Sequence, residues 1–121
     1  MKMKLWTSVT LAVGIAVATP LALLASARGD ARSNLDFGNK VATQGLWREA
    51  IFRWEKAVEI DPSYAEAYNN LGVGYEHEGR LDKARKAYEK ALELEPNNTR
   101  IQQNFELFKE INDRAAQKDK P

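Results

Sequence analysis

The chain has 121 residues, with 18 Lys and Arg against 17 Asp and Glu, so its formal charge is +1. This length suits one small domain. A charge near zero gives little electrostatic attraction to nucleic acid or to anionic membranes, and the lack of cysteine excludes disulfides, metal–thiolate sites and thiol catalysis.

Residues 1–27 have the parts of a secretory signal. Lys2 and Lys4 precede an uncharged stretch that ends in Ala25-Ser26-Ala27, a small-x-small pattern that signal peptidase accepts. The alternative is an uncleaved membrane anchor, because a spanning helix needs about 20 residues, although Pro20 would interrupt it. In both cases we expect the rest of the chain outside the cytoplasm, in the periplasm or another extracytoplasmic space, either free or anchored to the inner membrane.

The remainder of the chain repeats itself after 34 residues. EKAVEIDPSY at 55–64 returns as EKALELEPNN at 89–98. The same shift superposes small residues and prolines: Gly38 on Gly72, Gly45 on Gly79, Ala50 on Ala84, Ala57 on Ala91 and Pro62 on Pro96. Self-similarity at a fixed period predicts a stack of units, each of which buries its apolar face against the next.

Each unit is predicted to be a helical hairpin. In the second, residues 64–78 carry apolar residues at helical spacing, Gly79 ends that helix, and 81–94 forms the partner helix before Pro96. Residues 98–114 read as a single capping helix, because no second helical pattern follows them. We expect a domain over 28–114 and a disordered tail over 115–121.

These units resemble the tetratricopeptide repeat. The second unit, residues 65–98, keeps the residues of the family pattern: Tyr68, Leu71, Gly72, Tyr75, Ala84, Tyr88, Ala91 and Pro96. The first, residues 31–64, is more divergent. The resemblance implies an all-α fold, a right-handed α-solenoid of two hairpins plus a C-terminal capping helix, behind the N-terminal signal or anchor helix. It also suggests a small exported protein of bacterial type, while the fold itself leaves the partner open.

The sequence gives no sign of catalysis. His77 is the only histidine, and its helical neighbours at three and four residues are Val73, Gly74, Arg80 and Leu81, none of which is a metal ligand. The carboxylates along 82–95 alternate with Lys and Arg, which is typical of a solvated helix face. We therefore predict a protein that is not an enzyme, with no catalytic residue, metal or cofactor.

The resemblance implies a ligand groove, because the first helix of each tetratricopeptide hairpin lines the concave face. Transferred to this chain, the lining residues are Leu35, Asn39, Asn69, Asn70, Val73, His77, Arg100, Gln103 and Leu107. Side-chain amides suit an extended peptide backbone, because each offers a donor and an acceptor. Aliphatic residues beside them would make shallow side-chain pockets.

One subclass of the family holds a peptide's terminal carboxylate with two asparagines and several basic residues. Asn39 and Asn70 occupy the asparagine places and Arg100 one basic place, but Leu35 and Asn104 stand where that subclass has further basic residues. The missing charges remove most of the charge-assisted bonding, so the departure weakens this interpretation.

A second candidate interface is Ile51-Phe52, which stands where the second hairpin has Arg85-Lys86. One interpretation is local packing against residues 28–34 or the membrane-proximal segment, and the other is a contact patch for another subunit. Because repeat arrays usually need about three repeats, two hairpins and a cap should be marginally stable alone. Self-association into a homo-oligomer, or docking on a larger envelope protein, would compensate.

Together these features predict a non-catalytic protein–protein interaction module outside the cytoplasm, a scaffold or adaptor that binds a peptide or partner protein on its concave face. The alternatives are a chaperone-like holder of exported client peptides and a membrane-tethered assembly factor. Another protein or peptide is the expected partner, with no nucleic acid, and residues 1–27 offer a route to membrane association.

Overall fold

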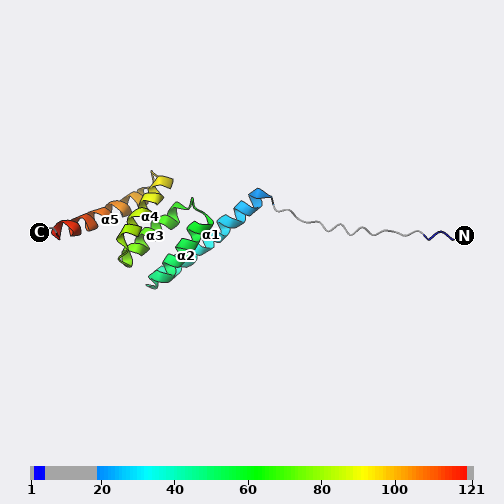
Figure 1. Ribbon diagram of the computed structural model, residues 1–121, viewed down its shortest axis with the longest axis horizontal. Helices are drawn as coiled ribbons and strands as arrows, with labels where there is room; N and C mark the ends of the chain where they lie inside the picture. The colour runs from blue at the N-terminus through cyan, green and yellow to red at the C-terminus, as the bar shows by residue number, and fades with distance from the viewer. Residues whose placement is uncertain (1, 5–18, 120–121) are drawn as a thin grey trace.

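The computed structural model describes residues 2–4 and 19–119, and this part of the chain contains five helices and no strand. Their bounds are α1 Pro20–Ala42, α2 Trp47–Ile60, α3 Ala65–His77, α4 Leu81–Leu94 and α5 Thr99–Lys118. The prediction of an all-α fold is confirmed. Figure 1 shows α1 and α5 reaching toward opposite ends of the molecule, with the other helices between them.

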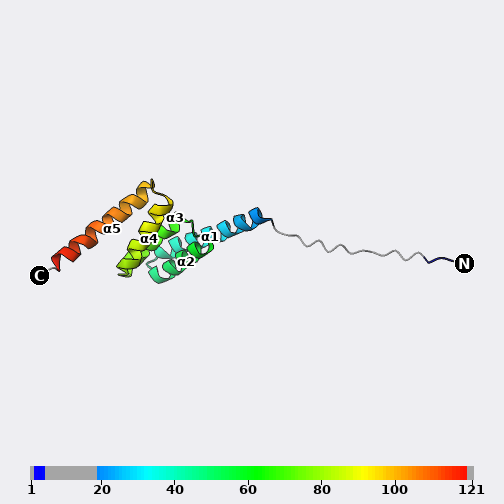
Figure 2. The ribbon, with the colours of Figure 1, turned by 45° about the horizontal axis from the view of Figure 1, so that its top comes forward.

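Neighbouring helices in the sequence are neighbours in space. The pair α1–α2 forms the first hairpin and α3–α4 the second; α2 then packs on α3, and α5 packs on both α4 and α3. Figures 1 and 2 show the same succession from two directions. Each hairpin turns at a glycine with a positive φ, 76° at Gly45 and 70° at Gly79, a conformation that other residues adopt only with strain.

The 34-residue period corresponds to a repeated close contact inside each hairpin. A Cβ atom added to Gly38 would lie 2.5 Å from Nε1 of Trp54, and one added to Gly72 would lie 2.6 Å from Cε1 of Tyr88. Only glycine lets the two helices of a hairpin approach this closely across a large aromatic ring. The glycine and the aromatic residue therefore recur together.

One hydrophobic core runs through all five helices. Its largest members include Trp54, Tyr88 and Phe108, from α2, α4 and α5. A smaller cluster of Ala65, Ala91 and Ile101 joins α5 to the second hairpin. The fifth helix thus covers the apolar face that the second hairpin would otherwise expose, which is what a terminal repeat unit requires.

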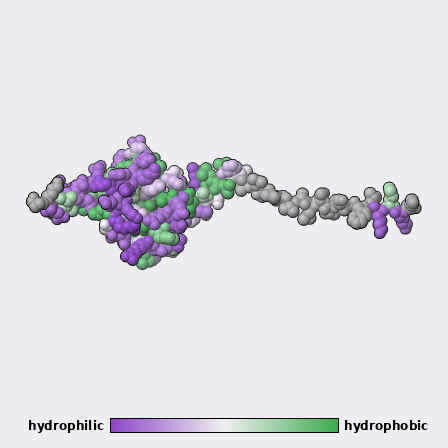
Figure 3. Space-filling view, viewed as in Figure 1, coloured by the Kyte–Doolittle hydropathy of each residue, from purple (hydrophilic) through white to green (hydrophobic). Residues whose placement is uncertain are grey.

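The first helix begins before the predicted repeat. Thr19 caps it, since its Oγ1 accepts a hydrogen bond of 3.3 Å from the Ala22 amide, and Pro20 stands at its first position. The helix continues through Ala25-Ser26-Ala27, but its first buried residue is Ala31. Leu21, Leu23 and Leu24 are exposed and form a hydrophobic area at the start of α1 (Figure 3).

The predicted signal or anchor falls mostly on residues 5–18, which lie outside the described residues. Among the helices within residues 2–4 and 19–119, none is both long and apolar enough to cross a membrane.

The predicted disordered tail is wrong in part, because α5 continues to Lys118 instead of ending at 114. Residues 115–118, AAQK, are good helix formers with no glycine or proline among them. An ion pair between Arg114 and Glu110, four residues apart, supports the last described turns.

Candidate functional site

The predicted groove residues lie on α1 and α3, the first helices of the two hairpins, and on α5, the capping helix. His77, Arg100, Gln103 and Leu107 are exposed, and Asn39, Asn70 and Val73 are half-buried. Leu35 and Asn69 are only 2% exposed. The first seven can therefore meet a ligand, and the last two cannot.

Leu35 and Asn69 are corrections to the predicted groove. Leu35 belongs to the main hydrophobic core, where burial of a leucine side chain contributes about 2 kcal/mol to folding. Asn69 is buried because α5 covers it: its Oδ1 accepts a hydrogen bond of 3.0 Å from Nδ2 of Asn104. Both side chains support the fold instead of the ligand surface.

A chain of side-chain amides crosses the structure beneath this surface. Oδ1 of Asn39 accepts two hydrogen bonds, one of 3.0 Å from Nε1 of Trp54 and one of 2.8 Å from Nδ2 of Asn70. Asn69 then donates to Asn70 over 3.4 Å. Together with the bond from Asn104, these hydrogen bonds connect α2, α1, α3 and α5. Within the described residues no buried side-chain nitrogen or oxygen lacks a hydrogen-bond partner. The network fixes the asparagine rotamers before any ligand binds.

The amide network leaves donors for a ligand. Among the described residues, Nδ2 of Asn39 donates to no protein group, and Nδ2 of Asn70 uses one of its two hydrogens. A ligand carbonyl could accept from both. Sequence reasoning found these two asparagines but missed Trp54 and Asn104, which hold them in place.

Arg100 does not provide an isolated positive charge. Its guanidinium lies 3.4 Å from Oε1 of Glu66. In addition, Leu35 is buried and Asn104 is engaged with Asn69 at the two places where the carboxylate-binding subclass has basic residues. The arrangement therefore suits a neutral peptide backbone better than a terminal carboxylate.

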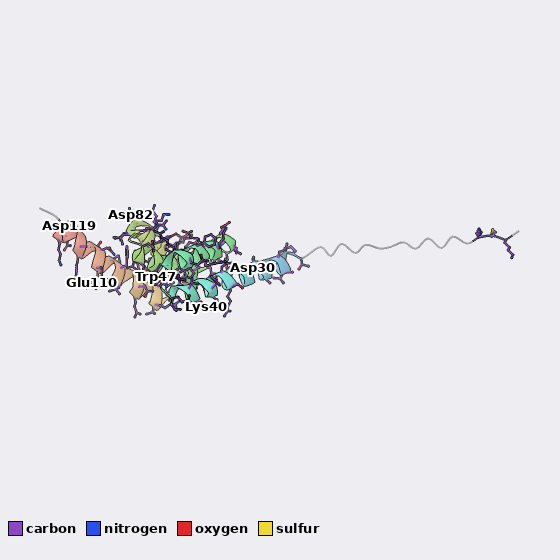
Figure 4. The ribbon with its side chains drawn as sticks, turned by 90° about the horizontal axis from the view of Figure 1, so that it is seen from below. Asp30, Lys40, Trp47, Asp82, Glu110 and Asp119 are labelled. Carbon is purple, nitrogen blue, oxygen red and sulfur yellow. The ribbon has the colours of Figure 1, made fainter. Side chains whose placement is uncertain are left out.

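His77 stacks on Trp47, with ring centroids 3.7 Å apart and planes 9° apart. Trp47 comes from α2, so the contact crosses from one hairpin to the next at the end of α3. Val73, Glu76 and His77 line an open pocket of about 210 Å³ beside the stack. Figure 4 marks Trp47 within the helical body, between Asp30 and Glu110. Among the described residues no three His, Asp or Glu side chains gather as a metal site would require.

The prediction of a second interface at Ile51 and Phe52 is wrong for Ile51, because its side chain is buried. This side chain is 4% exposed, and a Cβ added to Gly74 would lie 2.8 Å from its Cγ1, so it fills the space that the glycine leaves on α3. Phe52 is 48% exposed and has the Arg53 guanidinium 5.6 Å from its ring centre. Both residues line one open pocket of about 360 Å³, but only Phe52 is exposed, so the predicted patch reduces to Phe52.

Two tyrosines bind carboxylates of a neighbouring helix, one between the two hairpins and one within the second. The Tyr75 hydroxyl donates to Oε1 of Glu55 over 2.7 Å, and the Tyr88 hydroxyl donates to Glu76. Burial, and then the hydrogen bond to the carboxylate, raises the pKa of each hydroxyl well above the ordinary value of 10. Both remain neutral donors at physiological pH and act as structural groups.

Known sequences and structures resemble this chain over the same region. Residues 65–98 match the tetratricopeptide repeat, and residues 38–77 match a related TPR repeat, so the matches together span 61 of the 121 residues. The matched unit is typically a non-catalytic scaffold.

Individual relatives share the repeats but are much longer. Protein O-mannosyl-transferase TMTC1 of Mus musculus is 38% identical over 69 residues, which are 56% of this chain and 7% of the relative. The chloroplastic tetratricopeptide repeat domain-containing protein PYG7 of Arabidopsis thaliana is 42% identical over 50 residues, 41% of this chain and 17% of the relative. The alignments thus cover less than a fifth of either relative.

Among solved structures, the crystal structure of MamA protein superposes with a TM-score of 0.63 and 28% identity. The superposition covers 74% of this chain and 48% of that chain. The shared feature in all these comparisons is the helical repeat.

Proposed function

The chain belongs to the tetratricopeptide repeat family, and we propose that it is a scaffold or adaptor outside the cytoplasm that binds a peptide segment of a partner protein on the face formed by α1, α3 and α5. Tetratricopeptide repeats are protein–protein interaction modules. The transferase activity in the name of one relative stays with that protein, because the likeness is confined to its repeats.

The observation that carries the proposal is the fixed pair of amides on this face. Asn39 and Asn70 are bonded to each other and still offer N–H groups, and half-buried Val73 and exposed Leu107 lie on the same helices, α3 and α5. A preorganised amide pair can bond a peptide backbone without losing rotamer freedom on binding. The neighbouring aliphatic side chains would contact the peptide's apolar residues.

Two features support the proposed location. Residues 1–27 carry a basic start, an uncharged stretch and a small-x-small end. In the structure, residues 20–26 are exposed and Ala31 is the first buried residue of α1, so cleavage after Ala27 would remove no buried side chain from α1. The folded domain is therefore compatible with a cleaved signal.

Co-purification from the native host tests the binding face. Val73→Glu places a charge beside the amides, and Glu59→Lys changes an exposed residue on α2, away from them. We expect one partner that co-purifies with the unmodified chain and with Glu59→Lys but not with Val73→Glu. Unchanged co-purification with Val73→Glu would contradict the proposal. Many weakly bound peptides would instead favour a holder of exported client proteins.

The intact mass of the protein from the host's envelope fraction tests the location. A mass that starts at Arg28 would indicate a soluble exported module, and a mass that retains residues 1–27 would indicate a membrane-tethered adaptor. Recovery of the protein in the cytoplasmic fraction alone would contradict export. Sedimentation at several concentrations tests self-association, which requires a mass that rises with concentration.

A further inference from the structure

A second groove lies on the other side of the repeats, between α2 and α4. It has a volume of about 280 Å³ and is lined by Glu55, Val58, Tyr68, Leu71, Tyr75, Lys83, Lys86, Ala87 and Lys90. The helices α2 and α4 form its walls, and α3, which packs against both, forms its floor. None of these residues belongs to the proposed peptide-binding face.

The floor and the rim of this groove differ in character. Val58, Tyr68, Leu71 and Ala87 give the floor and walls an apolar lining, and three lysines from α4 lie along one edge. Lys90 pairs with Glu93 over 3.0 Å, whereas Lys83 and Lys86 make no ion pair with any described residue. The acid that lines the groove, Glu55, already accepts a hydrogen bond from Tyr75. The groove therefore has an excess of positive charge beside apolar surface.

The first hairpin has a different arrangement at the equivalent position, where Phe37 is 43% exposed. Phe37 corresponds to Leu71, and Arg53 and Glu49 correspond to Ala87 and Lys83 after the 34-residue shift. Arg53 lies over the Phe37 ring, 4.4 Å from its centre, and bonds Oε1 of Glu49 over 2.9 Å.

In the second hairpin the residue at the position of Arg53 is alanine, and the residue at the position of Glu49 is a lysine. Leu71 and Ala87 are themselves buried, so the open apolar surface of the groove comes from half-buried Val58 and Tyr68. The acid that the first hairpin has on this edge is replaced by a base. A complementary occupant would supply both an apolar surface and negative charge.

We propose that this groove binds an acidic amphipathic helix of a partner protein. Lys83, Lys86 and Lys90 are spaced by three and four residues, so they follow one face of α4 over about 10 Å. Acidic residues at the same spacing on a partner helix would form ion pairs with all three lysines, while the apolar residues between them would contact the apolar lining of the groove. A ligand with a single carboxylate could engage only part of this row.

A synthetic helical peptide provides the test. The probe has roughly 18 residues, enough to populate a helix, with Leu at i, i+3, i+4 and i+7 and Glu on both flanks of that stripe. Its counterpart replaces every Glu by Lys. Binding to the full chain is followed by fluorescence anisotropy of the labelled peptide. We expect the acidic peptide to bind at least about tenfold more tightly than the basic one.

Variants locate the binding site. Lys83→Glu gives this exposed edge the acid that the first hairpin has at the same repeat position and should weaken acidic-peptide binding severalfold. Lys86→Glu changes an exposed side chain, so it should weaken binding severalfold without affecting the fold, which circular dichroism checks. Lys118→Glu, an equal charge change near the end of α5, is the control and should stay within about twofold.

Several results would overturn the proposal. These are equal binding of the two peptides, no binding of the acidic peptide, or full binding by Lys86→Glu. If Val73→Glu abolishes binding of the acidic peptide, the peptide binds on the α1–α3–α5 face and not in this groove. If Val73→Glu retains binding, the groove is a site distinct from the proposed peptide-binding face. A dimer of the chain alone that Lys86→Glu dissociates would assign the groove to a second copy.

Discussion

The first hairpin, α1–α2, and the second, α3–α4, share an internal contact but differ in how they meet their neighbours. Both press an aromatic ring of the second helix onto a glycine of the first, Trp54 on Gly38 and Tyr88 on Gly72. Toward the next helix, however, Ile51 fills the space at Gly74, while Arg85 lies 5.3 Å from the ring centre of Phe108.

This difference shows which residues the repeat pattern determines. The contacts inside a hairpin depend on residues of the same unit and recur with the period. The contacts between hairpins depend on what the next helix offers, a gap in one case and an aromatic ring in the other. A residue at a given repeat position is therefore buried or exposed according to its neighbour.

Exchanging the residues that face the next helix should have the largest effect. Ile51→Arg copies Arg85 but places a charge in a site that is 4% exposed, and we expect the free energy of unfolding to fall by about 2–4 kcal/mol. Arg85→Ile, at a half-exposed position beside Asp113, should change it by less than about 1 kcal/mol. Urea unfolding measures both, and equal effects of the two exchanges would contradict the comparison.

Adding a methyl group at the shared internal contact should destabilise both hairpins. Gly38→Ala and Gly72→Ala each force a buried aromatic ring to move and should cost about 1–3 kcal/mol. Gly29→Ala, in α1 with no other group within 4 Å of the new Cβ, is the control and should stabilise by about 0.5–1 kcal/mol. If Gly72→Ala also stabilises the protein, the close contact between the helices of a hairpin is not the reason that glycine recurs after 34 residues.

Removing the link between the second hairpin and α5 should have a moderate effect. Asn104→Ala takes away the donor to the buried Asn69 amide oxygen and should cost about 1–2 kcal/mol. Gln103→Ala, an exposed neighbour with no side-chain hydrogen bond to another described residue, should stay within about 0.5 kcal/mol. Thermal unfolding of the two variants gives the comparison, and equal melting temperatures would exclude a structural role for the amide chain.

The smallest effect at neutral pH concerns the two buried hydroxyls. The pKa of Tyr75 and of Tyr88 is raised in the folded protein, while in the unfolded chain a tyrosine titrates near pH 10. Folding stability is thus intact below about pH 10 and falls as the pH rises above it, because only the unfolded state then loses the protons. Urea midpoints measured across this range should decline, and less steeply in Tyr75→Phe/Tyr88→Phe. An equal decline in that variant would assign the effect to other groups.

Sequence reasoning succeeded where the controlling residues lie close together in the chain. The glycine turns and the helices of the second hairpin follow from the 34-residue pattern. It failed for Ile51, whose burial depends on Gly74 in the next hairpin, and for Asn69, which α5 covers. A glycine in α3 at the place of Lys40 in α1 was the signal for the first of these.

The candidate site was predictable to the same extent. Asn39 and Asn70 could be placed from their positions in the repeat, but their hydrogen bonds to each other and to Trp54 join residues 31 and 15 positions apart. The basic edge of the α2–α4 groove depends on Lys83, which stands where the first hairpin has Glu49. Such differences between units become visible only when the helices are packed.

Native-state hydrogen exchange on the full chain tests most directly whether the two hairpins form one cooperative unit that holds the proposed binding face. We predict that buried amides of α2, α3 and α4 exchange with a common opening free energy equal to that of global unfolding. Residues 20–30 should exchange faster, because Ala31 is the first buried residue of α1. Opening of α1–α2 at a clearly lower free energy than α3–α4 would contradict it, because the amide pair of Asn39 and Asn70 would then not be preorganised.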